Sequence, residues 1–147
     1  MERKQNRKSI EAIRMLNNTF LEFFQKDREL AGLDQKSITS CMDIADEYLN
    51  VFLAEQELEM AAGTSGVQID SYIGDFLLGY SMIKGEDSAD QAAESIQGFY
   101  ACMLERNLIE KKAYDEVIDT INELSPQWIA KRELFQGGGS LDPFSFL

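Results

Sequence analysis

The amino-acid sequence predicts an all-α fold, a compact bundle of five or six helices, on three observations. Apolar residues recur at three- and four-residue steps in six successive segments of the 147-residue chain, which is the spacing of one helix face. Several of these segments are bounded by residues that favour helix ends. No segment alternates apolar and polar residues between turn signals, so the sequence predicts no β-sheet.

Two helices are expected first, over about residues 8–30 and 35–61, from their apolar stripes. Gly32 breaks the first stripe because glycine is a poor helix former. Asp34 is placed to cap the second helix with its carboxylate. Short connections of this kind are typical of antiparallel helical bundles.

A third helix is expected from Asp70, its N-cap, to Gly85, after a loop over residues 63–66. Gly74 and Gly79 lie inside this helix, and each costs up to about 1 kcal/mol relative to alanine. Interior glycines of this kind either loosen a helix or allow a neighbouring element to approach closely.

Ser88 begins a sequence with capping-box spacing and predicts the start of a fourth helix. Asn107 can end that helix in the left-handed conformation. A fifth helix is expected over about residues 108–124. Because proline favours the first position of a helix, Ser125 and Pro126 predict that a short last helix begins there.

One helical domain is therefore expected over residues 1–135, followed at 136–147 by a glycine-rich linker and an apolar C-terminal peptide. Cys41 and Cys102 lie on apolar stripes, which predicts packing roles for both. The residues predicted to form the core are Ile13, Phe20, Tyr48, Phe52, Phe76, Ile96, Tyr100, Met103, Ile118 and Ile121.

The composition excludes several classes of chemistry. The chain contains no histidine, which removes Ser-His-Asp and Cys-His nucleophiles, imidazole bases and zinc sites that use histidine. Two cysteines are too few for a tetrahedral thiolate site or a disulfide scaffold. The sequence therefore predicts no catalytic residue, no metal site, no cofactor and no enzymatic activity.

Charge is distributed unevenly along the chain. Residues 37–110 carry 14 acidic side chains against only two basic ones, Lys84 and Arg106. Such a segment predicts a solubilising surface, a face for a basic protein partner, or a mimic of nucleic acid. Because phosphates attract cations, weak or no DNA binding is expected.

A basic cluster at the N-terminus is the one candidate for nucleic-acid contact. A solvated start of the first helix is the alternative interpretation of these four charges. The cluster consists of Arg3, Lys4, Arg7 and Lys8.

Membrane insertion is not expected, because no segment reaches about 18 uninterrupted apolar residues. The first residues are charged and lead into an amphipathic stretch rather than an apolar signal core. The sequence therefore predicts a cytoplasmic protein.

Two features are candidates for partner binding. Trp128 lies near the end of the predicted bundle and is interpreted either as a core residue or as an interface anchor. The peptide after the glycines is rich in apolar residues and stiffened by proline, which lowers the entropy lost on docking. Alternatively, it folds back on its own domain or on a second copy, or the Gly-Ser stretch is an artificial junction. The predicted docking residues of this peptide are Leu141, Asp142, Pro143, Phe144, Phe146 and Leu147.

Several stretches between about residues 30 and 130 share a family resemblance. They resemble the helical, SAM-like core-binding domain at the N-terminus of tyrosine recombinases (phage integrases), and a group of small stand-alone uncharacterised bacterial and archaeal proteins. The resemblance implies a compact bundle that clasps DNA and is joined to a separate catalytic domain, and it implies no catalytic residue in this chain. The stretches are 32–38 (GLDQKSI), 48–50 (YLN), 72–76 (YIGDF), 95–100 (SIQGFY) and 103–109 (MLERNLI).

The functional prediction is a non-enzymatic protein-interaction module with an acidic surface and a C-terminal docking peptide. Its expected partner is a protein with a basic surface, or a second copy bound through the peptide. Two alternatives are an accessory nucleic-acid-binding protein, using the basic N-terminal cluster, and an acidic inhibitor that mimics nucleic acid.

Overall fold

The structure is a computed structural model, and it describes residues 2–57, 66–79 and 88–136. These residues contain no β-strand, so the predicted all-α bundle is confirmed for the described part of the chain. They form five helices, two of which include π-helical stretches: α1 (Glu2–Leu30), α2 (Gln35–Asp46) with η1 (Glu47–Glu57), α3 (Gly66–Ser71) with η3 (Tyr72–Phe76) and α4 (Leu77–Gly79), α5 (Ser88–Glu105), and α6 (Lys111–Gln136).

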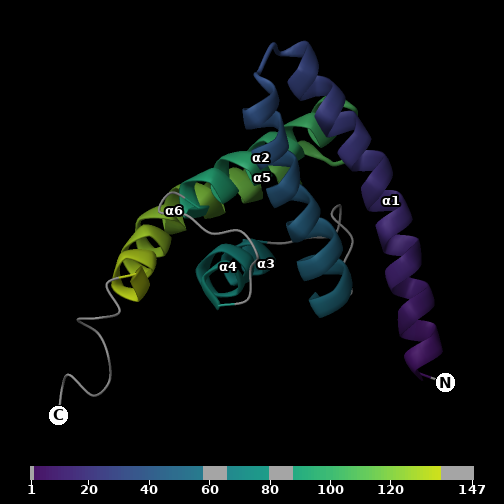
Figure 1. Ribbon diagram of the computed structural model, residues 1–147, viewed down its shortest axis with the longest axis horizontal. Coiled ribbons are helices and arrows are strands. Elements are labelled where there is room, and N and C mark those ends of the chain that lie inside the picture. Colours follow the sequence, from purple (N-terminus) through teal and green to yellow (C-terminus); the bar gives the residue numbers. More distant parts are fainter. Residues whose placement is uncertain (1, 58–65, 80–87, 137–147) are drawn as a thin grey trace.

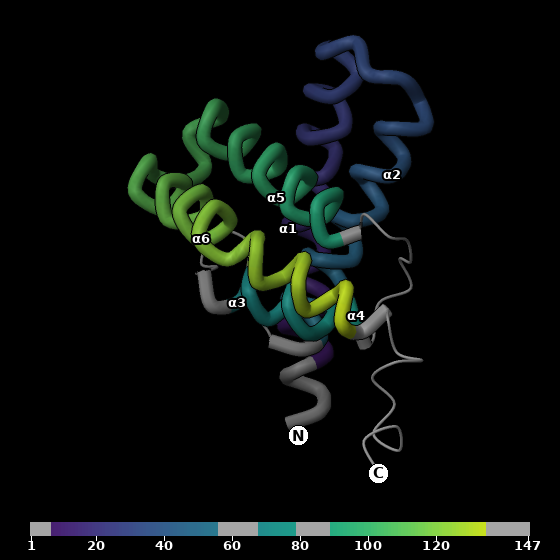
Figure 2. Tube along the Cα trace, turned by 90° about the vertical axis from the view of Figure 1, so that its left-hand side faces the viewer, coloured from purple at the N-terminus to yellow at the C-terminus, as the bar shows by residue number. Residues whose placement is uncertain are grey.

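The helices pack around one core. Helix α1 forms a long side of the molecule, and α2 returns beside it (Figure 1). Helices α5 and α6 lie side by side as an antiparallel hairpin, with α3 packed on α6 (Figure 2). Helix α5 also packs against α1 and α2, so it touches most of the bundle.

The turn between α1 and α2 follows the sequence prediction. Gly32 has a φ of 80°, and the N–H of Leu33 donates to the carbonyl of Arg28 at 3.4 Å. The carboxylate of Asp34 then accepts a hydrogen bond from the Ser37 N–H at 2.7 Å. The pKa of Asp34 is lowered chiefly by that hydrogen bond. The predicted cap of the second helix is therefore confirmed.

The end of α5 is also as predicted. Asn107 has a φ of 60°, in the left-handed region that asparagine tolerates better than most residues. The N–H of Leu108 donates to the carbonyl of Met103 at 2.9 Å, which satisfies an orphan carbonyl of the helix.

Three predicted helix starts are wrong. Helix α1 begins at Glu2 instead of about residue 8, and the third helix begins at Gly66, which places Asp70 inside it instead of at its N-cap. No short last helix begins at Ser125, because α6 runs through Pro126 to Gln136.

The apolar face of α6 explains why the helix continues through the proline. Val117, Ile121 and Trp128 are all buried at helical spacing on both sides of Pro126. Burial of this continuous stripe outweighs the one backbone hydrogen bond that proline removes. Pro126 itself is exposed, so its ring meets no neighbouring helix.

Two π-helical stretches were not predicted. In a π-helix the backbone N–H bonds to the carbonyl five residues earlier, as the Leu77 N–H does to Tyr72 at the end of η3. The longer stretch, η1, follows α2 without a break. Both stretches face the core, which they supply with large aromatic side chains.

Most of the predicted core is confirmed. Every residue of the predicted set is buried except Ile118, which is half-buried. Cys102 is 5% exposed, as expected for a packing residue, whereas Cys41 is only half-buried. Leu30, the last residue of α1, is 82% exposed and does not join the core.

Gly74 allows α6 to approach η3 closely. A Cβ at this position would lie 3.3 Å from the Asp70 Oδ1 atom and 3.3 Å from the Trp128 Cδ1 atom. The Trp128 Nε1–H donates to that same Asp70 oxygen at 2.7 Å. The close-approach interpretation of this glycine is therefore the correct one.

Replacing Gly74 by alanine is expected to lower the free energy of unfolding by about 1 kcal/mol, although alanine is the better helix former. The indole is hydrogen-bonded and buried, so it cannot move away at little cost. Urea unfolding followed by circular dichroism measures the change. The matched control is Gly98→Ala on α5, where a new Cβ meets the movable end of the Arg28 side chain. Equal stabilisation by both substitutions would contradict the prediction.

Candidate functional site

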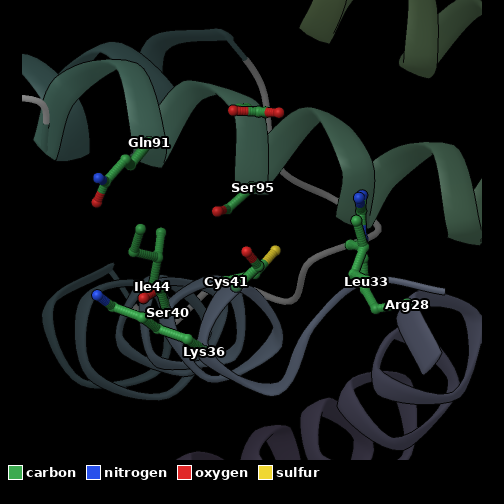
Figure 3. A pocket seen from close by; sticks show the side chains of 10 residues that line it. Arg28, Leu33, Lys36, Ser40, Cys41, Ile44, Gln91 and Ser95 are labelled. Atoms are coloured by element: carbon green, nitrogen blue, oxygen red, sulfur yellow. The ribbon is translucent and has the colours of Figure 1, made fainter. Parts of the chain in front are cut away.

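A pocket of about 380 Å³ lies at the corner where the end of α1 meets α2 and α5 (Figure 3). We call it the Arg28 pocket. Helix α5 forms one wall and α2 the facing wall, and Leu33 from the intervening turn closes one end. The polar and charged side chains that line it are Arg28, Lys36, Ser37, Ser40, Gln91, Glu94 and Ser95.

Arg28 is held in place by two contacts. Its guanidinium carbon lies 4.8 Å from the centroid of the Phe24 ring, within the range of a cation–π interaction. Its far end lies against α5 at Gly98, where a Cβ would overlap the guanidinium. Arg28 forms no hydrogen bond or ion pair with any residue that the structure describes. Its donors are therefore available to a ligand.

The wall formed by α5 contributes a buried hydroxyl. Ser95 is 5% exposed, and its side chain points from α5 into the Arg28 pocket towards α2 (Figure 3). Within the described part of the chain, this hydroxyl has no hydrogen-bond partner. Cys41 lies opposite it on α2, and Ser40 lines the same pocket (Figure 3). A bound ligand can therefore meet hydroxyl groups on both walls.

The charge of the Arg28 pocket is opposite in sign to that of the chain. Arg28 and Lys36 contribute two positive charges and Glu94 one negative charge, which leaves a net charge of +1. The whole chain carries −12. The pocket is thus an electropositive site on an acidic protein, a setting that favours an anion.

A second cluster, next to Arg28, consists of Asp27, Arg106 and Cys102, whose polar groups bond to one another. Arg106 donates to the Asp27 carboxylate at 2.8 Å, and its guanidinium carbon lies 4.4 Å from the Phe23 ring centroid. Hydrogen bonding to the Cys102 thiol, and then to Arg106, lowers the pKa of Asp27. Burial, and then the hydrogen bond to Asp27, raises the pKa of Cys102 to about 11. Cys102 is therefore a protonated, weakly nucleophilic thiol at neutral pH.

The core contains a buried set of polar aromatic residues. The Tyr72 hydroxyl donates to the Glu47 carboxylate at 2.8 Å, and the hydroxyls of Tyr48 and Tyr100 lie 3.0 Å apart. Burial, and then the negative charge of Glu47, raises the pKa of Tyr72 far above its usual range. None of these residues lines the Arg28 pocket. Their hydrogen bonds join η1 to η3 and α5.

Polar side chains of α1 bond to backbone carbonyls of η1. The Asn17 Nδ2 atom donates to the Leu49 carbonyl at 2.9 Å. Arg14 donates to the Asn50 carbonyl at 3.0 Å and pairs with Glu55. Asn17 and Asn50 are both buried, so these contacts fix the separation of the two helices.

The residues predicted for partner and nucleic-acid binding do not converge on one described site. Arg7 and Lys8 are exposed on α1, and Arg3 and Lys4 belong to its first turns, where side chains are outside the described part. The predicted C-terminal peptide lies entirely outside the described residues. Trp128 is 3% exposed, so it is a core residue and its alternative role as an interface anchor is withdrawn.

The Arg28 pocket was not predicted from the sequence. The sequence signal that bears on it is Gly98 in the interior of α5, which marks the close approach of Arg28 and borders the neighbouring hollow. Arg28 and Ser95 are separated by 67 positions in the sequence and come together only through the packing of α1 on α5.

Comparison with known proteins found no match: no protein family, no curated protein and no solved structure is similar to this chain. No helix among the described residues is long and apolar enough to cross a membrane. The same residues contain no group of three or more side chains able to hold a metal ion. The case for a function therefore depends on the geometry of this chain alone.

Proposed function

We propose that this chain is a non-enzymatic protein-interaction module that presents an acidic surface to a basic partner. The observation that carries the proposal is a stripe of carboxylates along α6, which we call the α6 acidic stripe. It consists of Asp115, Asp119 and Glu123, spaced four residues apart, with Glu116 beside them. All four side chains are exposed.

The carboxylates of the α6 acidic stripe repel one another along the helix, and Lys111 and Lys112, which border the same patch, offset this repulsion only at its N-terminal end. Like charges four residues apart destabilise a helix by about 0.2–0.5 kcal/mol per pair. None of the four carboxylates forms an ion pair with a described residue. A basic partner surface would relieve the remaining repulsion, and the negative charge of the stripe would speed its association with such a partner.

Two reactive groups of the described part are poorly placed for catalysis, whereas the free Cys41 thiol borders the Arg28 pocket. The Cys102 thiol is protonated, and the Tyr72 hydroxyl is buried against Glu47. Neither group borders the Arg28 pocket or the α6 acidic stripe. The peptide at 141–147 supplies a second contact in this proposal, argued from its sequence alone.

Neutralising the α6 acidic stripe is expected to abolish capture of the partner without loss of stability. The variant is Asp115→Asn, Asp119→Asn and Glu123→Gln, compared with the wild-type chain in affinity capture from source cells. Its free energy of unfolding should be equal or higher, because repulsion is removed. A control variant removes the same charge elsewhere through Asp43→Asn and Asp90→Asn, both exposed, together with Glu105→Gln.

Two results decide the proposal. Loss of a partner in the stripe variant alone, with salt-sensitive affinity for the purified partner, supports it. Identical partners for the stripe variant, the control variant and the wild type would overturn it.

Deleting residues 137–147 tests the peptide: an unchanged melting temperature with weaker capture supports docking to a partner. A fall in stability of about 1 kcal/mol or more would place the peptide on its own domain or a second copy.

Nucleic-acid binding is the second candidate function, and exposed Arg7 and Lys8 on α1 favour it. The excess of carboxylates opposes it, since phosphate contacts require cations. We expect binding of duplex DNA to be weaker than about 10 μM at physiological salt. Submicromolar binding in a gel-shift assay, lost on neutralising these two residues, would reverse the order of the two candidates.

A further inference from the structure

We propose that the Arg28 pocket binds a small organic carboxylate, with Arg28 and Ser95 on the charged group and apolar side chains around its body. The site is separate from the α6 acidic stripe and from the peptide at 141–147. The proposal for the Arg28 pocket can therefore be tested independently of the proposed interaction with a basic partner.

Arg28 has the properties that are needed to bind a carboxylate. A guanidinium binds a carboxylate through two parallel N–H···O bonds, which adds geometric specificity to charge attraction. The Phe24 ring and the close approach to Gly98 restrict the Arg28 side chain before any ligand arrives. Less conformational entropy is therefore lost on binding.

The acidic residue next to Arg28 in the sequence is bonded to other groups. Asp27, the preceding residue, is already bonded to Arg106 at 2.8 Å and also hydrogen-bonded to the Cys102 thiol. Asp27 and Arg28 both border the next surface hollow, and of the two only Arg28 also borders the Arg28 pocket. Glu94 borders the Arg28 pocket but forms no ion pair with Arg28, so the guanidinium is available to a carboxylate from outside the chain.

Ser95 is an independent indication of a ligand. Ser95 is 5% exposed, and its hydroxyl points into the Arg28 pocket, where it is placed to donate a hydrogen bond to a ligand. The Ser95 hydroxyl has no hydrogen-bond partner among the described residues. It can therefore donate a hydrogen bond to a ligand oxygen near Arg28.

The charge and lining of the Arg28 pocket favour a carboxylate over a phosphate. Its net charge of +1, from Arg28, Lys36 and Glu94, balances one negative charge and not the two of a phosphate at neutral pH. Leu33 and Ile44 supply apolar surface, which suits a ligand with a hydrocarbon body. The volume of about 380 Å³ is within the usual range for small-molecule sites.

The test is a titration of the full chain with benzoate, followed by amide chemical shifts in two-dimensional NMR. We expect saturable shifts confined to α2 and α5 around Ser40, Ser95 and Gly98, with a Kd in the millimolar range. The neutral analogue benzamide should give no such shifts. Equal shifts with benzamide, or none with benzoate, would overturn the proposal. Tighter binding of inorganic phosphate at the same residues would also overturn it.

Variants separate the pocket from general charge effects. Arg28→Gln is expected to weaken benzoate binding about tenfold or more, because it removes the positive charge and the paired N–H donors. Ser95→Ala is expected to weaken binding several-fold, because it removes a single hydroxyl donor. Lys26→Gln removes the same charge from an exposed position of α1 and should leave binding unchanged. An equal loss in Lys26→Gln and Arg28→Gln would show non-specific attraction and overturn the proposal.

Gly98→Ala tests the position of Arg28 without removing its charge. The new Cβ displaces the guanidinium, so benzoate binding should fall about tenfold while the chain stays folded. Alkylation of Cys41, which lines the pocket and is half-buried, gives a second readout. Benzoate should slow alkylation in the wild type and not in Gly98→Ala. Full protection in Gly98→Ala would contradict the assignment of Arg28.

Discussion

Replacing Phe24 by alanine is expected to lower the free energy of unfolding by about 3–5 kcal/mol, the range for removing a fully buried aromatic side chain. Phe24 is 0% exposed, and its ring packs edge-on against Phe99, with centroids 5.7 Å apart. It therefore joins the C-terminal half of α1 to the middle of α5. Alanine would leave a cavity at the contact between these two helices, and Arg28 would lose the ring beneath it.

The matched control is the neighbouring aromatic residue. Phe23 is half-buried and is covered by the Arg106 guanidinium, 4.4 Å from its centroid. Phe23→Ala is expected to cost about 1–2 kcal/mol, because less apolar surface leaves the interior and solvent can replace part of the contact. Urea unfolding of the full chain measures both values. Equal losses for the two variants would contradict the burial difference that the structure shows.

Features set by one or two neighbouring residues were predictable from the sequence. Gly32, Asp34 and Asn107 mark helix ends because a positive φ or a carboxylate cap is a local requirement of the backbone. Pro126 carries an equally local signal, and the prediction from it was wrong. The apolar stripe of α6 continues past the proline, and tertiary packing outweighed the local preference.

The candidate sites depend on contacts between distant parts of the chain. Glu47 reaches the Tyr72 hydroxyl 25 positions away, and neither the periodicity of η1 nor that of η3 indicates this pair. Arg28 looks like an ordinary helix-end cation until α5 places Gly98 against it. Interior glycines were the most useful clue, since Gly74 and Gly98 both mark where another element comes close.

Replacing Tyr72 by phenylalanine is expected to lower the free energy of unfolding by about 1.5–3 kcal/mol at pH 7, the range for a hydrogen bond to a charged group. The substitution keeps the ring and removes the hydroxyl that donates to Glu47 at 2.8 Å. Glu47 is 8% exposed, so water does not readily replace the lost donor. The packing of the ring against Phe76, at a centroid distance of 5.7 Å, should remain.

The same substitution should make stability less dependent on pH in the alkaline range. In the folded chain, burial and then Glu47 raise the pKa of Tyr72 well above its ordinary value of about 10, so the hydroxyl keeps its proton. The unfolded chain loses that proton above about pH 10, which favours unfolding. Tyr72 therefore stabilises the fold fully below pH 10, and this contribution falls by about 1.4 kcal/mol for each further pH unit.

Urea unfolding at pH 7, 10, 11 and 12 tests both parts together. We expect the difference between wild type and Tyr72→Phe to be largest at pH 7 and to shrink above about pH 10, because only the wild type loses the Tyr72 contribution. The Cys102 thiol, with a pKa of about 11, affects both chains equally. Phe76→Leu is the control, since lost packing lowers stability without changing the alkaline slope. Parallel decline of wild type and Tyr72→Phe from pH 10 to 12 would contradict the buried Tyr72–Glu47 pair.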